Sequence, residues 1–130
     1  SKDSLNRLLL HNTVTGCTMM INRALVEKVK SIPEEAIMHD WWIAMVASVF
    51  GKIAYIDEPL MLYRQHGKND TGAKKYGMKY FIKKFFSKPS FEKYILQSKA
   101  FLALYNKELD QYHKIMLEEF SNFNQLNKYQ

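Results

Sequence analysis

The sequence contains one cysteine, three prolines and five glycines among 130 residues. A single cysteine cannot form an internal disulfide and gives no CxxC zinc motif, so we expect Cys17 to be a small buried residue in a reducing compartment. No run reaches 18 apolar residues, so no transmembrane helix is predicted. Residues 1–3 have no signal-peptide character. There is also no glycine-rich phosphate loop and no Asp-x-Asp motif.

The length and the 47% hydrophobic content suit one domain of modest size with a real core. The net charge of +6 is unevenly distributed along the sequence. Residues 1–67 hold seven basic and seven acidic side chains, whereas residues 74–93 hold seven lysines and one glutamate. A local basic cluster of this kind favours an anionic surface or partner.

The hydrophobic pattern predicts an α/β fragment that is mostly α. Helical periodicity is expected at residues 5–10, 23–30 and 40–50. Two or three short strands are expected at residues 18–21, 52–56 and 60–64. From about Gly72 the pattern is helical throughout, so we divide the sequence into an α/β part, residues 1–72, and a helical tail, residues 73–130.

The block at residues 38–42 places Asp40 between a histidine and two tryptophans. Asp is favoured at the start of a helix and Gly just past its end, so Asp40 and Gly51 predict a helix of about three turns between them. One interpretation is a general base beside a surface on which sugar rings stack. The other is an N-cap aspartate with core tryptophans.

Five blocks, taken together, resemble the C-terminal half of a family 2 glycosyltransferase with the GT-A fold, and most closely the bacterial rhamnosyltransferase-like enzymes that build surface polysaccharides. The resemblance covers about residues 5–75. Its five blocks lie at residues 12–18, 32–33, 39–42, 55–60 and 63–69. The resemblance implies a partial GT-A domain whose donor half lies N-terminal to this sequence. We therefore expect the 130 residues alone to transfer no sugar, and some hydrophobic surface to be exposed or buried by self-association.

The implied reaction is inverting transfer of a sugar, with rhamnose as one candidate, from a nucleotide-diphosphate donor to a saccharide or lipid-linked acceptor. By this resemblance Asp40 is the general base that takes the proton of the acceptor hydroxyl. His39, Trp41 and Trp42 are assigned to the acceptor site, although one of the two tryptophans is expected to be core because adjacent helical residues point about 100° apart. Gly16 either permits close approach to the acceptor or makes a tight turn.

The same resemblance makes His66 a candidate ligand for a divalent metal, manganese or magnesium, in the full-length enzyme. Arg64 and Lys68 are candidates for the donor phosphates or are ordinary surface charges.

Residues 76–88, read as a helix, gather an apolar arc of about 140°. The arc consists of Met78, Phe81, Ile82, Phe85 and Phe86, and it is flanked by Lys79, Lys83, Lys84 and Lys88. This pattern fits a helix at an anionic membrane surface or one that packs on the domain. We expect a cytoplasmic protein, either free or peripheral at the inner face of the membrane, with no nucleic-acid partner.

Residues 90–106 and 108–128 predict two further helices, arranged as an antiparallel pair. The alternative function is a non-enzymatic helical interaction or membrane-docking module, in which the block at residues 38–42 is purely structural.

Overall fold

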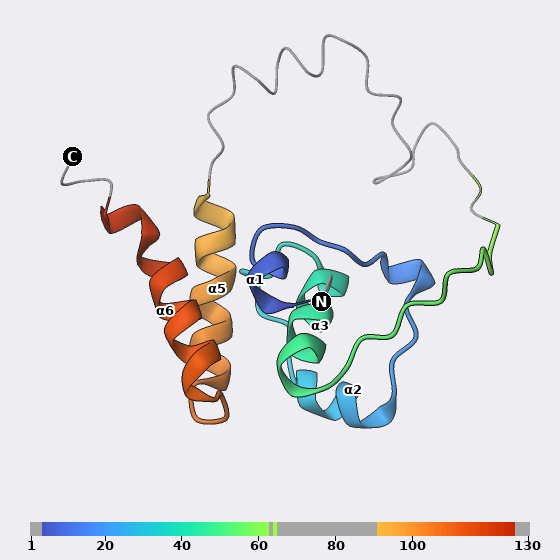
Figure 1. Cartoon of the computed structure of the whole chain (residues 1–130), viewed down its shortest axis with the longest axis horizontal. Coiled ribbons are helices and arrows are strands. Elements are labelled where there is room, and N and C mark those ends of the chain that lie inside the picture. Colours follow the sequence, from blue (N-terminus) through green and yellow to red (C-terminus); the bar gives the residue numbers. More distant parts are fainter. Residues whose placement is uncertain (1–3, 63, 65–90, 127–130) are drawn as a thin grey trace, which may run out of the picture. The chain divides into compact units, whose positions relative to one another are not determined.

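The structure is a computed structural model that describes residues 4–62, 64 and 91–126. Its elements, in chain order, are α1 (Leu5–Leu8), the 3-10 turn η1 (Gly16–Thr18), α2 (Arg23–Val29), α3 (His39–Phe50), α5 (Glu92–Tyr105) and α6 (Gln111–Leu126) (Figure 1). The described residues up to Tyr55 form one compact unit with those from Phe91 onward, and residues from Ile56 to Arg64 belong to a second unit. The core and the candidate site both lie in the first unit.

Helix α3 is the centre of the first unit. Residues from Asp40 to Ala47 are all buried, because the helix is apolar around most of its circumference and is covered on several sides. α1 and α2 both contact it. Its largest side chain, Trp42, is fully buried and meets the rings of Phe101 and Tyr105 from α5. The prediction of a helix of about three turns that ends at Gly51 is therefore confirmed.

Helices α5 and α6 form the predicted antiparallel pair, which lie side by side in Figure 1. Phe101 and Leu117 are fully buried within the pair, where they join the core around α3. The buried hydroxyls of Ser98 and Ser121 lie 3.1 Å apart and form a hydrogen bond between the two helices. A polar pair inside an apolar seam is tolerated because each hydroxyl satisfies the other.

The α/β prediction is wrong, because the described residues contain helices and no strand. Thr18 is the last residue of the 3-10 turn, and the residues that follow it form no strand. Met20 among them is 97% exposed. The expected strands at residues 52–56 and 60–62 are also irregular in the described chain. Short apolar runs form strands only when a second strand pairs with their backbone, and the described residues supply none. The described residues therefore contain no part of a GT-A sheet.

Several large apolar side chains of the described residues are exposed. Met20, Leu60 and Leu62 are each more than two-thirds exposed, and Tyr55 is 83% exposed. No helix among the described residues is long and apolar enough to cross a membrane.

Candidate functional site

The carboxylate of Asp40 is the centre of the candidate site. Helix α3 begins at His39 with Met38 as its N-cap, so Asp40 lies in the first turn and the N-cap interpretation is wrong. The residue is only 3% exposed. The N-terminus of α3 carries a partial positive charge that favours an anionic side chain in this position.

Three N–H donors hold the Asp40 carboxylate. Its Oδ1 accepts from the Asn12 amide at 3.2 Å and from the backbone N–H of Trp41 at 2.7 Å. Its Oδ2 accepts from the backbone N–H of Gly16 at 2.8 Å. Among the described residues Asp40 makes no ion pair, so hydrogen bonds and the helix terminus compensate its burial.

The loop before η1 is shaped to deliver two of those donors. Asn12 accepts the backbone N–H of Val14 on its Oδ1 at 3.1 Å, which forms an Asx turn and leaves its NH₂ group free to reach Asp40. The next turn is closed when the hydroxyl of Thr18 donates to the carbonyl of Thr15 at 3.0 Å. The turns bring Asn12 and Gly16 to one carboxylate, although both lie more than 20 residues before it in the sequence.

Gly16 starts the 3-10 turn, as the tight-turn interpretation expected, and the atoms closest to its missing side chain belong to His39 and Asp40. A Cβ at Gly16 would lie 2.8 Å from Nε2 of His39 and 3.5 Å from Oδ2 of Asp40. The first distance is a clash and the second is ordinary contact. His39 itself is exposed, so its imidazole lies over the glycine at the solvent side of the site.

Both tryptophans of the block belong to the core, which the structural interpretation of the block expected, whereas the acceptor-site assignment expected only one of them there. Trp41 is 6% exposed, donates its indole N–H to the carbonyl of Leu8 and meets Tyr94 edge-on with ring centroids 5.7 Å apart. Trp42 is fully buried against Phe101, at 5.3 Å between centroids. Neither ring offers a free face for stacking on a sugar in this structure. The assignment of Trp41 and Trp42 to an acceptor wall therefore gains no support.

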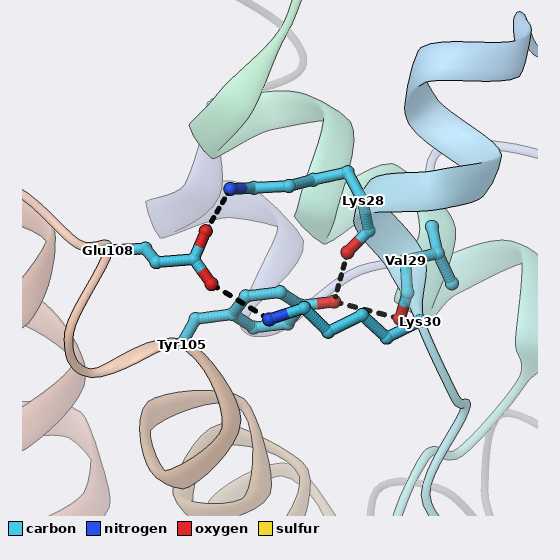
Figure 2. A network of polar contacts seen from close by, with 5 residues as sticks. All are labelled: Lys28, Val29, Lys30, Tyr105 and Glu108. Atoms are coloured by element: carbon cyan, nitrogen blue, oxygen red, sulfur yellow. Dashed lines mark hydrogen bonds and ion pairs between the residues drawn. The ribbon is translucent and has the colours of Figure 1, made fainter.

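A second polar cluster, which the sequence did not predict, joins the end of α2 to the end of α5 (Figure 2). The Tyr105 hydroxyl donates to the carbonyls of Lys28 and Val29, at 3.1 and 2.9 Å. These are terminal carbonyls of α2, which have no partner within their own helix. Burial, reinforced by the charge of Glu108, raises the pKa of Tyr105 to about 12, and the Trp42 indole opposes that rise.

The carboxylate of Glu108 completes this cluster by accepting hydrogen bonds from the ammonium groups of Lys28 and Lys30. Hydrogen bonds from these two lysines lower the pKa of Glu108 to about 2. Lys30 has φ 56° and ψ −113°, a backbone conformation that side chains disfavour. Nothing in the sequence pattern signals a contact across more than 70 residues, so this cluster could not be found without the structure.

An apolar groove lies between α1 and α6, with a volume of about 740 Å³. Its lining is mostly apolar and includes Leu9, Leu10, Met116, Phe120 and Phe123, with Glu118 and Glu119 also on it. It shares no lining residue with the Asp40 site.

The other predicted site residues lie either in the second unit or outside the described residues. Arg64 is described, exposed and part of the second unit. His66 and Lys68, the four lysines at positions 79, 83, 84 and 88, and the proposed boundary between residues 72 and 73 lie outside the described residues. Within the described ranges, no group of three His, Cys, Asp or Glu side chains could hold a metal ion. Cys17 is exposed, so the prediction that it is buried is wrong.

Comparison with protein-family models, with curated proteins and with solved structures finds no match to this chain.

Proposed function

We propose that this chain is the acceptor side of an inverting glycosyltransferase, with Asp40 as the general base. One observation carries the proposal. Two of the sequence blocks that resemble family 2 glycosyltransferases, residues 12–18 and 39–42, meet at the single carboxylate of Asp40. Three donors hold this buried carboxylate in a fixed position, as a general base requires.

The geometry suits a base whose position is fixed before the acceptor arrives. Oδ1 already accepts two hydrogen bonds, whereas Oδ2 accepts one, from Gly16, and keeps a lone pair for a further donor. In this proposal the acceptor hydroxyl binds at the remaining lone pair of Oδ2, near the exposed imidazole of His39, whose Nε2 lies close to Gly16. His39 is then placed to hydrogen-bond the same acceptor.

The donor side belongs to the same proposal and is supported only by the sequence resemblance. It comprises a nucleotide-diphosphate sugar and a divalent metal, with His66 as a metal ligand and with Arg64 and Lys68 near the phosphates. A saccharide or lipid-linked acceptor at the inner membrane face would suit the lysines at positions 79, 83, 84 and 88. No step of the mechanism at Asp40 depends on these assignments.

The proposal implies a longer natural protein that also contains the donor half, and it is tested by comparing that protein with the 130-residue chain. We expect the longer protein to release nucleotide diphosphate from a sugar donor in a metal-dependent way when a saccharide acceptor is present. The isolated chain should show no turnover, because it has no donor phosphate loop and no Asp-x-Asp motif. A longer protein that neither binds nor consumes any nucleotide sugar would overturn the proposal.

A second candidate function, a non-enzymatic interaction module, is favoured by the burial of Asp40 and of both tryptophans. In that case the three hydrogen bonds to Asp40 only hold the loop on α3, and the groove between α1 and α6 is the functional surface. Phe123→Ser in the groove and Asp40→Asn in the site separate the two functions. An interaction module loses partner binding with Phe123→Ser, whereas a glycosyltransferase loses turnover with Asp40→Asn.

A further inference from the structure

The side-chain amide of Asn12 accepts one hydrogen bond and donates another. Its Oδ1 accepts the backbone N–H of Val14 at 3.1 Å, and its Nδ2 donates to Oδ1 of Asp40 at 3.2 Å. Because the N–H of Val14 requires an acceptor, the orientation of the amide is fixed, and its NH₂ group must face the carboxylate. Asn12 is partly buried, so water competes weakly for these bonds.

We propose that Asn12 is a positioning residue that fixes the Asp40 carboxylate for proton abstraction, an inference that rests on the proposed function of Asp40. Trp41 is the next residue on α3, so its N–H moves with Asp40 and cannot orient it against the loop. Gly16 holds Oδ2, the oxygen that retains a free lone pair. Asn12 is the side chain that holds the other oxygen from outside the helix, and so it limits rotation of the carboxylate about its own axis.

The ionisable groups on the two segments that meet at Asp40 are Arg7, His11, Cys17 and His39. His39 precedes Asp40 and lies over Gly16, while Arg7 and His11 precede Asn12 on the same segment. None of them forms an ion pair with Asp40 among the described residues. A charge placed at position 12 therefore acts on Asp40 with little compensation from other side chains.

Two substitutions separate positioning from loop structure, because both preserve the turn at Val14. In Asn12→Ser the hydroxyl can still accept the N–H of Val14, but it is too short to reach Asp40. In Asn12→Asp a carboxylate keeps the turn and replaces the donor with a like charge about 3 Å from Asp40. Asn6→Asp, at an exposed position of α1, is a control that adds the same charge away from the Asp40 carboxylate.

The experiment measures pH–rate profiles and thermal unfolding of the longer natural protein that contains this chain. We expect Asn12→Ser to lower kcat about 10- to 100-fold with little change in KM, because a displaced base loses alignment while the acceptor site is intact. We expect Asn12→Asp to move the acidic limb of the kcat/KM profile to higher pH by about one unit or more. Asn12→Asp should also lose stability at neutral pH and regain it at a pH where one carboxyl is protonated, whereas Asn6→Asp should do neither.

Each outcome decides the inference. If Asn12→Ser keeps its kcat and Asn12→Asp keeps the acidic limb, Asn12 is only a loop residue and the inference is overturned, even where Asp40→Asn abolishes turnover. If Asp40→Asn itself keeps turnover, the proposed function fails and the inference fails with it. If Asn12→Asp does not fold at neutral pH, its unfolding at acidic pH and the kcat of Asn12→Ser still decide.

Discussion

The backbone N–H of Gly16 donates a 2.8 Å hydrogen bond to Oδ2 of Asp40, across 24 residues of sequence. This bond closes the loop before η1 onto the first turn of α3. It makes Asp40 both a structural anchor and the best candidate for a reactive group in the described chain. The predictions below separate these two roles.

The anchoring role predicts that Asp40→Asn lowers the free energy of unfolding by about 1–3 kcal/mol, the cost of leaving a buried donor without an acceptor. An asparagine offers one acceptor oxygen and one NH₂ group, so one of the three donors must face another donor. Chemical denaturation of the 130-residue chain measures the change. Asp110→Asn is the matched control and should cost little. Asp110 caps α6 by accepting the N–H of His113, which Asn does equally well, and its ion pair with the His113 ring is at an exposed carboxylate. Equal stability of Asp40→Asn and the wild type would show that the carboxylate holds nothing.

Gly16→Ala is expected to move His39 while leaving the fold intact. The added methyl group clashes with the end of an exposed imidazole, which can rotate away, and makes only ordinary contact with Asp40. The free energy of unfolding should change by about 0.5 kcal/mol or less. The NMR shifts of the His39 ring should change, whereas the backbone amide at position 16 should stay protected from hydrogen exchange. Gly51→Ala, where the new Cβ meets the Ala47 carbonyl at 3.4 Å, is a control that leaves the His39 signals unchanged. Loss of amide protection at position 16 would contradict this prediction.

Tyr105→Phe should destabilise the chain by about 1–3 kcal/mol, because it leaves the buried carbonyls that its hydroxyl satisfies without a donor. Tyr112→Phe, on an exposed ring, should have little effect. The measurement is urea denaturation at neutral pH, and equal losses in the two variants would contradict the assigned role.

The raised pKa of Tyr105 also predicts a pH dependence with a definite sign. The neutral phenol is favoured in the folded state, so this contribution is fully present below pH 10 and is lost as pH rises from 10 towards about 12, because only the unfolded chain ionises in that range. Denaturation of the wild type and of Tyr105→Phe across this range should show a steeper decline for the wild type. Parallel curves would mean that the hydroxyl is not held in the folded state.

At position 30, glycine should give a more stable protein than alanine, the reverse of the usual order. The φ of 56° and ψ of −113° of Lys30 suit glycine, and holding another residue there costs on the order of 1 kcal/mol. Lys30→Gly and Lys30→Ala both lose the ion pair to Glu108, so their difference isolates the backbone effect. We expect Lys30→Gly to be the more stable of the two in thermal denaturation. A more stable Lys30→Ala would show that the backbone at position 30 is relaxed.

The sequence predicted the helices better than the strands, for a physical reason. Helical periodicity and the helix-termination signal at Gly51 are local features, so a helix at residues 40–50 could be predicted without knowledge of the rest of the fold. A strand depends on a partner that sequence does not specify, and the runs at residues 18–21 and 52–56 lack one in the described chain. The Asp40 site was found through its residue types, but its donor Asn12 was missed because the pattern did not reveal the fold of the loop. The link from Tyr105 to Lys28 and Val29 spans the segment between the two described stretches and leaves no trace in periodicity.

The most direct test of the account is the turnover of Asp40→Asn in the longer natural protein, measured where the variant is folded. Tyr105→Phe is the control, because a similar loss of stability is expected from a site that shares no contact with Asp40. General-base catalysis contributes about 10²–10⁴-fold, so we predict that kcat of Asp40→Asn falls by about that factor while donor binding and the kcat of Tyr105→Phe stay near the wild-type values. An Asp40→Asn protein that is folded and turns over as fast as Tyr105→Phe would contradict the account and leave Asp40 as a structural anchor alone.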